Sequence, residues 1–304
     1  MRFSVPHPIP YQGSKRRLAS AILSHVDTGA YSRLIEPFAG SAAVTLAAAQ
    51  RKAFPRFVIA DSLEPLVDLW SRIIDDPTPI ADGYEQLWNS ERKRPIEAFY
   101  DVRTEFNQDK DPAKLLYLLA RCVKNAVRFN PSGEFNQSPD KRRTGTRPDL
   151  MRAELFAAHR LLQGKTETLF ADFLESFEQG RSGDFFYLDP PYQGTSEGRD
   201  SRYVGGVPRE KLLEGLDLLN RKGIPFLLSY DGTCGERSYG DRLPKELASR
   251  ILLDVGRSSQ ATLNGEDHVT VESLYVSHSI VPACADDKTM ALRDFDNQRS
   301  ILFA

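Results

Sequence analysis

The sequence predicts an α/β fold built on a mostly parallel sheet. A short buried strand over residues 34–38 leads through a tight turn into an alanine-rich helix over 42–50. A second strand over 57–61 and a helix over 63–74 repeat this pattern, and the alternation resumes at residue 168 after a long interruption. Strands that alternate with helices are typical of parallel sheets with helices packed on both faces.

The composition is that of an ordinary globular protein. The chain has 304 residues, of which 40% are hydrophobic and 27% charged, and a formal net charge of −2. No apolar run approaches the roughly 18 residues of a membrane span, and residues 1–6 lack the apolar core of a signal peptide. Cys122, Cys234 and Cys284 form no zinc-binding pattern. We therefore expect a cytoplasmic protein with no metal site and no membrane partner.

The middle of the chain interrupts the α/β pattern. Between residues 76 and 164 charged helices dominate, and Asp111-Pro112 predicts a helix start with an N-cap followed by proline. Residues 128–148 are rich in Asn, Gly, Ser, Pro and Arg and predict a hairpin or a long loop. We expect an inserted, mainly helical domain over 76–164, between the two parts of one sheet domain over 1–75 and 165–304.

The second half of the chain continues the sheet. Its expected elements are strands over 168–170, 185–188 and 224–229, an amphipathic helix over 209–221, and two alternating segments over 251–256 and 269–277. Alternation of this kind is typical of the antiparallel strands that close a mixed sheet. The tail after Ile280 is expected to lie at the periphery.

The most informative motif is Asp189-Pro190-Pro191-Tyr192, which directly follows the strand over 185–188. The prolines fix φ and remove two backbone donors. A carboxylate, rigid carbonyl groups and a flat ring together suit a planar base that carries an exocyclic amine, as in enzymes that extrude a base from a duplex. The plainer alternative is a strand end, because Pro-Pro pairs commonly stop strands.

A turn and a carboxylate predict the site of an adenosine-containing cofactor. Gly40 follows the first strand, and Asp61 ends the second strand 21 residues later, where a carboxylate can hold ribose hydroxyls. Ala42 and Thr45 replace the other glycines of a dinucleotide loop, so NAD and FAD are disfavoured. S-adenosylmethionine has no phosphates, and its cationic groups would be attracted by Glu36 and Asp61. The alternative for Asp61 is a helix cap.

Two further signals are weak when taken singly. The turn Tyr11-Gln12-Gly13-Ser14-Lys15 offers an ammonium group for a carboxylate. Asp172-Phe173 follows a strand and can hydrogen-bond and pack against an adenine ring. The plain alternatives are a solvated lysine after a loop and a core residue beside a surface residue.

Taken together and in this order, the motifs resemble those of the Dam-like (alpha group, D12 class) adenine-specific DNA methyltransferases. The resemblance rests on Tyr11–Lys15, Glu36-Pro37-Phe38-Ala39-Gly40-Ser41, Asp61 and Asp189–Tyr192, and it covers residues 8 to 280. The inserted region adds residues similar to the family's DNA-contacting hairpin: Asn125, Arg128, Asn130, Gly133, Phe135 and Asn136. The resemblance implies a Rossmann-like sheet that binds S-adenosyl-L-methionine, with an inserted helical domain that recognises double-stranded DNA.

The resemblance also implies roles for individual residues. Tyr11, Gly13 and Lys15 would line the methionine end of the cofactor, Glu36 to Ser41 would form its loop, and Asp61 would hold its ribose. Asp172 and Phe173 would meet its adenine. Asp189 and the Pro190 carbonyl, followed by Pro191, would accept hydrogen bonds from the target amine, and Tyr192 would stack on the flipped base.

The chain departs from the family pattern at two places. Ala42 stands where the family usually has a second glycine, and the residues after Asn136 differ from the usual proline-glycine turn. That hairpin contacts DNA in the family, so the recognition sequence cannot be inferred. We expect DNA contacts from Asn125, Arg128, Asn130, Asn136, Lys141, Arg142 and Arg143.

The expected activity is site-specific methylation of the N6 amine of adenine, by base flipping and direct in-line transfer. The alternatives are a non-catalytic DNA-binding module with a methyltransferase fold, and an enzyme that methylates RNA or a protein glutamine. A monomer or weak dimer is expected, and a restriction endonuclease is a candidate partner.

Overall fold

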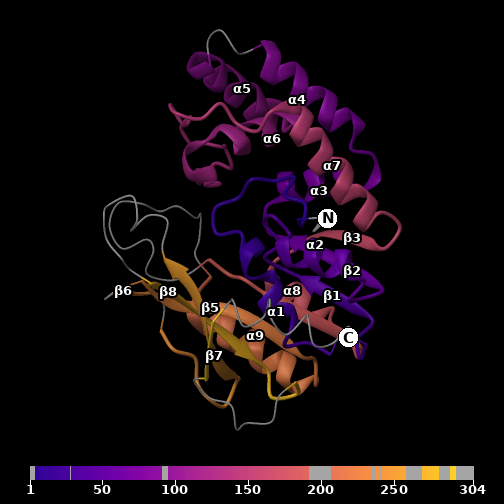
Figure 1. Ribbon diagram of the computed structural model, residues 1–304, viewed down its shortest axis with the longest axis vertical. Helices are drawn as coiled ribbons and strands as arrows, with labels where there is room; N and C mark the ends of the chain where they lie inside the picture. Colours follow the sequence, from indigo (N-terminus) through magenta and orange to yellow (C-terminus); the bar gives the residue numbers. More distant parts are fainter. Residues whose placement is uncertain are drawn as a thin grey trace.

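A mixed sheet forms the lower half of the molecule in Figure 1, and helices from the middle of the chain form the upper half. The computed structural model describes residues 4–27, 29–90, 95–191, 207–234, 237–239, 241–257, 269–280 and 288–291. Tyr192 and the basic run Arg92–Arg94 lie outside these residues.

Nine strands of the described chain form a single sheet. Their order is β3 (Thr166–Phe170), β2 (Arg56–Asp61), β1 (Arg33–Glu36), β4 (Asp184–Leu188), β5 (Phe226–Cys234), β8 (Val269–Val276), β7 (Ser249–Arg257) and β9 (Lys288–Ala291), and β6 (Arg237–Tyr239) pairs with β5. Strands β1 to β5 run parallel, and β8 is antiparallel to both of its neighbours. The tail after Ile280 was expected at the periphery, and its strand β9 forms one edge of the sheet, parallel to β7.

Both faces of the sheet are buried, because alternate residues of each parallel strand belong to different cores. Phe185 and Tyr187 of β4 join the core on one face, and Phe186 and Leu188 join the core on the other. The first face is covered by a 3₁₀ turn (Lys15–Arg17), α1 (Ala19–Leu23), α2 (Ala43–Gln50) and α3 (Glu64–Asp75). The second is covered by α8 (Phe173–Glu178) and α9 (Arg209–Arg221). This is a Rossmann-like arrangement, as the sequence predicts.

The helical half consists of α4 (Thr78–Ser90), α5 (Pro95–Asp109), α6 (Pro112–Arg121) and α7 (Pro148–Leu162). The predicted helix start at Asp111 is confirmed, since its carboxylate accepts a hydrogen bond from the Lys114 N–H at 3.0 Å. Helices α6 and α7 pack on α3, and α7 also packs on α2. Trp70 of α3, Leu119 of α6 and Leu155 of α7 belong to one hydrophobic cluster. The helical half therefore shares its core with one face of the sheet.

The segment between α6 and α7 is mostly loop. A 3₁₀ turn covers Val123–Asn125, and single β-bridges join Phe129 to Phe135 and Cys122 to Pro139. The Phe129 and Phe135 rings meet edge to face, with centroids 5.5 Å apart, and both pack on Phe106 of α5. These aromatic contacts fix a loop that has almost no regular secondary structure.

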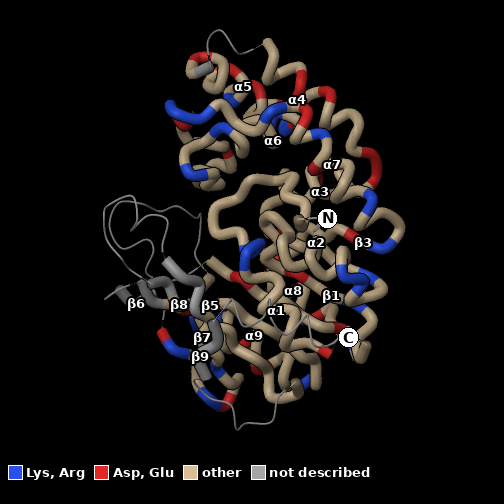
Figure 2. The backbone as a smooth tube through the Cα atoms, in the orientation of Figure 1, with Lys and Arg blue, Asp and Glu red and all other residues tan. Residues whose placement is uncertain are grey.

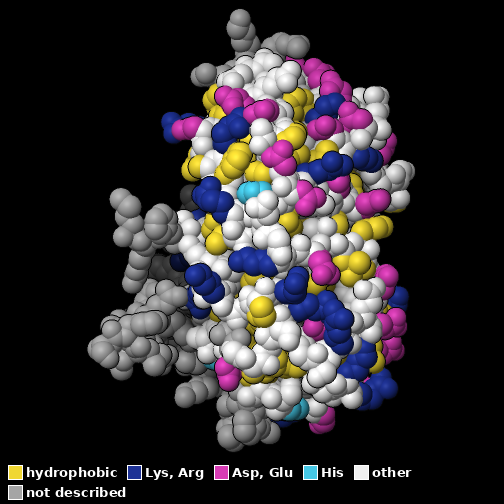
Figure 3. All heavy atoms as spheres, turned by 90° about the vertical axis from the view of Figure 1, so that its right-hand side faces the viewer, with side chains coloured by type: hydrophobic (Ala, Val, Ile, Leu, Met, Phe, Trp, Pro, Cys, Tyr) yellow, Lys and Arg dark blue, Asp and Glu magenta, His cyan; other side chains and the backbone are white. Residues whose placement is uncertain are grey.

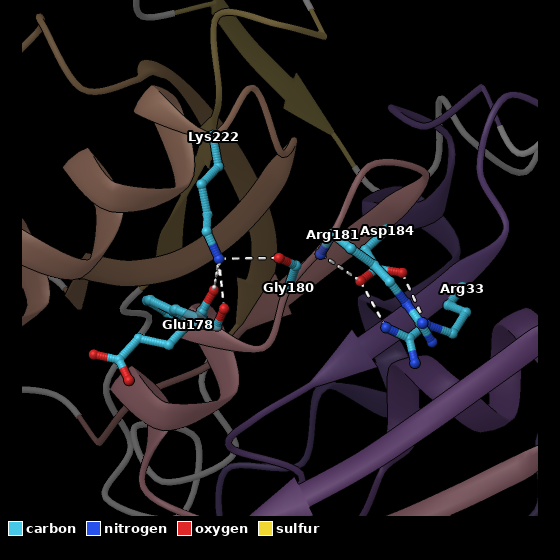
Figure 4. A network of polar contacts seen from close by, with 7 residues as sticks. Arg33, Glu178, Gly180, Arg181, Asp184 and Lys222 are labelled. Carbon is cyan, nitrogen blue, oxygen red and sulfur yellow. Dashed lines mark hydrogen bonds and ion pairs between the residues drawn. The ribbon is translucent and has the colours of Figure 1, made fainter.

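Ion pairs and carbonyl contacts close the edge of the sheet where the parallel strands begin (Figure 4). Arg33 donates two hydrogen bonds to the Asp184 carboxylate, at 2.8 and 2.7 Å, and the Arg181 N–H donates a third at 2.9 Å. Lys222, which follows α9, donates to the carbonyl groups of Phe177, Glu178 and Gly180. In the described part of the chain, no helix has the length and apolar character needed to traverse a bilayer.

Candidate active site

Segments that are far apart in the sequence line one cavity of about 680 Å³. The cavity lies where β1, β2 and β4 end, which is the edge opposite the Asp184 ion pairs. The strand order reverses between β1 and β4, and such a switch point is the usual ligand site of an open α/β sheet. The residues singled out from the sequence that line it are Tyr11, Gln12, Gly13, Ser14, Lys15, Glu36, Phe38, Ala39, Gly40, Ser41, Asp61, Asn130, Gly133, Asp189, Pro190 and Pro191.

The turn between β1 and α2 is held in place from three sides. Gly40 has a φ of +48°, and a Cβ built on it would lie 3.1 Å from the Tyr11 ring. Its N–H donates to Asp61 Oδ2 at 3.1 Å, and its carbonyl accepts from Trp70 Nε1 at 2.9 Å. A side chain at this position would be strained and crowded, so glycine is required here. Contacts within the protein therefore fix the shape of the turn.

Ala42 occupies the left-handed region, with φ 46° and ψ 38°, as the residue before α2. Its side chain is fully buried. The departure from glycine noted in the sequence is therefore accommodated, although a left-handed alanine costs about 1 kcal/mol.

Two acidic side chains border this turn. Glu36 is 3% exposed, and its Oε2 accepts hydrogen bonds from the N–H of Thr45 at 3.0 Å and from the Thr45 hydroxyl at 2.6 Å. Burial raises the pKa of Glu36 to about 8, against the lowering effect of these hydrogen bonds. Burial also raises the pKa of Asp61 to about 6. A cationic ligand beside them would favour their ionised forms.

The Asp61 carboxylate links the Gly40 turn to the residue that precedes α3. Its Oδ1 accepts from the Leu63 N–H at 3.0 Å, just before α3, while its Oδ2 holds Gly40. It therefore stabilises a helix start and still lines the cavity.

Lys15 and Asp189 meet at the end of β4. The Lys15 ammonium is 2.9 Å from Asp189 Oδ1 and 3.0 Å from Oδ2, and it also donates to the Gly13 carbonyl at 3.2 Å. The Lys15 side chain is only 7% exposed. Burial raises the pKa of the Asp189 carboxyl, and Lys15 lowers it in part. The sequence suggested Lys15 for a cofactor carboxylate, and in the structure its nearest anionic partner is Asp189.

The far wall of the cavity comes from the helical half of the molecule. It consists of Lys110, Val127, Phe129, Asn130, Pro131 and Gly133. The Gln12 N–H donates to the Asn125 carbonyl at 2.9 Å, which ties this wall to the Tyr11–Lys15 turn. One cavity thus joins the expected cofactor site to the loop expected to contact DNA.

The residues expected to contact DNA have different local roles. Asn125 donates to the Leu119 carbonyl at 2.8 Å, and Asn130 accepts from the N–H groups of Ser132 and Glu134 within its own turn. The Arg128 carbonyl accepts from the Asn136 N–H at 3.0 Å, whereas the buried Asn136 Oδ1 has no hydrogen-bond partner. Asn125 and Asn130 therefore shape the loop.

Lys141, Arg142 and Arg143 are exposed. Figure 2 shows several basic segments in this part of the loop, beside α5 and α6. Arg143 is paired with Asp140 at 2.7 Å. Basic residues are not confined to the loop, because Lys and Arg also gather over the sheet half of the face shown in Figure 3. Surface charge alone therefore does not locate a DNA-binding face.

Some predicted site residues lie outside the cavity wall. Pro37, Asp172 and Phe173 are not among the residues that line it. Asp172 caps α8 by accepting from the Leu174 N–H at 3.0 Å, and Phe173 is buried against Phe38, with ring centroids 5.3 Å apart. Phe173 therefore packs against Phe38, which lines the cavity.

Sequence reasoning missed several cavity residues: Ser62, Leu63, Glu64, Pro65, Lys110, Val127, Phe129 and Val207. The first four open α3 directly after Asp61, so the strand-end position of Asp61 was an available signal. Lys110 and Val207 had no local signal. No group of three or more His, Cys, Asp or Glu side chains in the described ranges could hold a metal ion.

Comparisons with known proteins agree with this geometry. Residues 11–259 match the family model described as D12 class N6 adenine-specific DNA methyltransferase. The retron Ec67 DNA adenine methylase of Escherichia coli is 27% identical over 236 residues, which cover 76% of this chain and 79% of that protein. The DNA adenine methylase of Escherichia coli K12 is 26% identical, covering 77% and 84%. The type II methyltransferase M.MjaIII of Methanocaldococcus jannaschii is 26% identical, covering 61% and 68%.

Proposed function

Because the chain belongs to the D12 class N6 adenine-specific DNA methyltransferases, we propose that it uses S-adenosylmethionine to methylate an adenine extruded from duplex DNA into the cavity. The chain is an adenine-specific DNA methyltransferase by its family. The donor, the extrusion of the base and the roles of the residues are our proposal. The single cavity that joins Tyr11–Lys15, Glu36–Ser41, Asp61 and Asp189–Pro191 supports it most strongly.

The cavity has features that suit S-adenosylmethionine. The Gly40 turn lines the cavity and packs closely against the Tyr11 ring. Glu36 and Asp61 are acidic groups whose ionised forms a cation would favour. We assign the turn to contact with the cofactor, Asp61 to its ribose, and Tyr11 and Gly13 to its methionine end. When bound, the cofactor supplies an electrophilic methyl group on a positively charged sulfur. The predicted adenine contact of Asp172 and Phe173 stays a prediction.

Asp189 and the Pro190 carbonyl would hold the target amine. The nitrogen lone pair of adenine N6 is delocalised into the ring, so the free amine is a poor nucleophile. Two fixed acceptors would orient both N–H bonds and favour a pyramidal nitrogen whose lone pair points toward the donor. Positive charge then develops on this nitrogen, and the preorganised oxygens stabilise it. The nitrogen loses one proton after the bond to carbon has formed, and Asp189 is the carboxylate placed to accept it.

The loop between α6 and α7 would contact the DNA. It forms the far wall of the cavity, so a base that enters the site would pass beside Phe129 and Asn130. Asn136 Oδ1 is buried without a partner and is the candidate for a base contact, because a bound base edge can satisfy it. Lys141 and Arg142 are better suited to phosphate contacts. We also propose a restriction endonuclease as the functional partner, since M.MjaIII is named a type II methyltransferase.

The test is methyl transfer by the purified chain. Duplex DNA, RNA and a protein extract are incubated separately with labelled S-adenosylmethionine, and the modified bases are mapped by sequencing. We expect N6-methyladenine at one short sequence in duplex DNA and no label in RNA or protein. Asp189→Ala should abolish the transfer while retaining affinity for DNA. Transfer to RNA or protein alone, or full turnover by this variant, would refute the proposal.

A further inference from the structure

A third acidic side chain, Glu272 on β8, faces the Lys15 and Asp189 pair. Its Oε2 lies 4.0 Å from the Lys15 ammonium, which is too long for a hydrogen bond. This oxygen is buried and has no hydrogen-bond partner. A buried carboxylate oxygen without a partner is costly, so its position beside an ammonium group calls for an explanation.

The fold places Glu272 there through an irregularity in the sheet. The β5–β8 ladder shifts register between Ser229 and Gly232, so two residues of β5 oppose one of β8. Glu272 pairs with Gly232 directly after this bulge. Bulges bend a strand and redirect the side chains beside them. No side chain fits at Gly232, because a Cβ built there would lie 2.7 Å from the Val271 carbonyl oxygen.

The contacts of Lys15 conflict with the proposed role of Asp189. The ammonium group is within hydrogen-bond distance of both carboxylate oxygens. A target amine needs at least one of these oxygens as an acceptor. An ammonium bonded to both oxygens occupies one acceptor site on each and competes with the amine, so a shift of Lys15 would free Asp189 on one side. Glu272 Oε2, which lies 4.0 Å from the ammonium and has no hydrogen-bond partner, is an acceptor available to it.

We propose that Glu272 is a positioning residue that takes over the Lys15 ammonium when Asp189 binds the target amine. This inference rests on the proposed function of Asp189. A movement of about 1 Å would bring the 4.0 Å separation to hydrogen-bond length. Lys15 then keeps a charged partner in both states, and Asp189 is freed on one side. Glu272 is not among the residues that line the cavity, so it acts through Lys15.

The charges around Glu272 determine in which direction its replacement should shift the pH dependence of methylation. Among the described residues, the charged groups recorded beside Glu272 or its partners are Lys15, Asp189 and, beyond Asp189, Glu36. Burial raises the pKa of the Glu272 carboxyl, Lys15 lowers it, and the like charge of Asp189 raises it. Repulsion between two like charges is mutual, so a charged Glu272 also opposes ionisation of Asp189. Replacing Glu272 by glutamine removes one negative charge. The Asp189 carboxyl should then ionise at lower pH.

The first test is Glu272→Gln, which keeps the shape of the side chain. Single-turnover methylation should slow by about tenfold or more, since a charged hydrogen bond is lost. The KM for DNA should stay close to that of the wild type. The acid limb of the pH–rate profile should move to lower pH. A wild-type rate, or a slower rate with an unmoved acid limb, would overturn the proposal, because the latter is what a merely structural role predicts.

Asp184→Asn is the matched control. It makes the same change of carboxylate to carboxamide in a buried ion pair, at the opposite edge of the sheet. We expect it to lower the melting temperature while leaving the acid limb and the turnover of the folded enzyme unchanged. A similar shift of the acid limb in this control would show that any buried carboxamide has the effect, and would also overturn the proposal.

The second test needs no turnover. In a crystal structure of ligand-free Asp189→Ala, the Lys15 ammonium should lie within about 3.2 Å of the Glu272 carboxylate. If this variant does not fold, Asp189→Asn serves the same purpose. A Lys15 that remains beyond hydrogen-bond distance of Glu272 would refute the inference. If the wild-type chain does not methylate DNA, the proposed function fails, and this structure still decides whether Glu272 is the alternative partner of Lys15.

Discussion

Strand β4 carries an acidic residue at each end, and the two have opposite surroundings. Asp184, its first residue, is 2% exposed and accepts three hydrogen bonds, two from Arg33 and one from the Arg181 N–H. Asp189, just after its last residue, is 20% exposed, and the ammonium beside it also lies near Glu272. The two carboxylates are separated by a strand of only five residues.

With the role that we propose for Asp189, the two ends of one strand serve stability and chemistry respectively. Asp184 is held by fixed donors on the same edge of the sheet, so it needs no further hydrogen-bond donor from a ligand. The partner of Asp189 is a flexible side chain with a second acceptor nearby. A carboxylate whose hydrogen bonds all come from fixed donors stabilises the fold. A carboxylate whose donor can move to a second acceptor can release that donor and bind a substrate instead.

The largest expected effect comes from making the same change at both ends of β4. Asp189→Asn should lower the methylation rate by about a thousandfold or more, because a carboxamide cannot stabilise the positive charge that develops on the amine. Its effect on stability should be small. Asp184→Asn should instead cost about 3 kcal/mol of unfolding free energy, since it removes the charge that holds Arg33, whose side chain is only 13% exposed. Urea denaturation measures the loss of stability in each variant, and single-turnover assays measure the loss of rate. Equal losses of stability in the two variants would contradict the proposed difference between Asp184 and Asp189.

Glu36 is another buried carboxyl group, and its ionisation should make the stability of the protein depend on pH. Its pKa is raised from 4.5 to about 8, so the folded state binds a proton that the unfolded state has lost. The unfolding free energy should therefore fall as pH rises from 4.5 to about 8, by at most about 1.4 kcal/mol per pH unit from this group, and then level off.

Urea titrations of the wild type and of Glu36→Gln across this range provide the measurement. The variant should lack this part of the decline, while the contribution of Asp61, which ends near pH 6, should remain in both proteins. Parallel curves for the two proteins would mean that Glu36 is ionised in the folded state at low pH.

The same distinction between paired and available charges applies to the loop between α6 and α7, for which we propose DNA contact. Arg142 is exposed and has no ion pair with any described residue, whereas Arg143 is paired with Asp140. Arg142→Ala should reduce the slope of log K against log salt by about 0.9, the effect of one phosphate contact. Arg143→Ala should change it less. Binding titrations at several salt concentrations test this, and the reverse order would contradict it.

The smallest effect is expected at Ala42. Glycine there would relieve the left-handed strain but would lose a buried methyl group and increase the entropy of the unfolded chain. The net result should be a loss of about 0.5 kcal/mol. Ala47→Gly in the regular part of α2 is the control and should cost more, because it relieves no strain. Equal losses in thermal melts would show that the Ala42 conformation carries no strain.

The parts of the site that could be predicted from the sequence are those whose position depends only on residues adjacent in the chain. A strand that ends in Asp61 or in Asp189 places a carboxylate at the same edge of a parallel sheet, so these positions follow from local pattern. The position of Glu272 depends on the pairing of β8 with β5 and on a bulge in that pairing. The contact between Lys15 and Asp189 joins residues 174 positions apart. Neither leaves a local signal in the sequence.

The hydrophobic cluster that the helical half shares with α3 limits how residues 76–164, the expected DNA-recognition region, can be exchanged between relatives. Leu119 and Leu155 pack with Trp70, whose indole in turn holds the Gly40 carbonyl. A chimaera that imported only residues 76–164 would bring a foreign surface against Trp70 and disturb the Gly40 turn, which we assign to the cofactor. Engineering a new recognition sequence therefore requires the matching face of α3 to be transplanted with it.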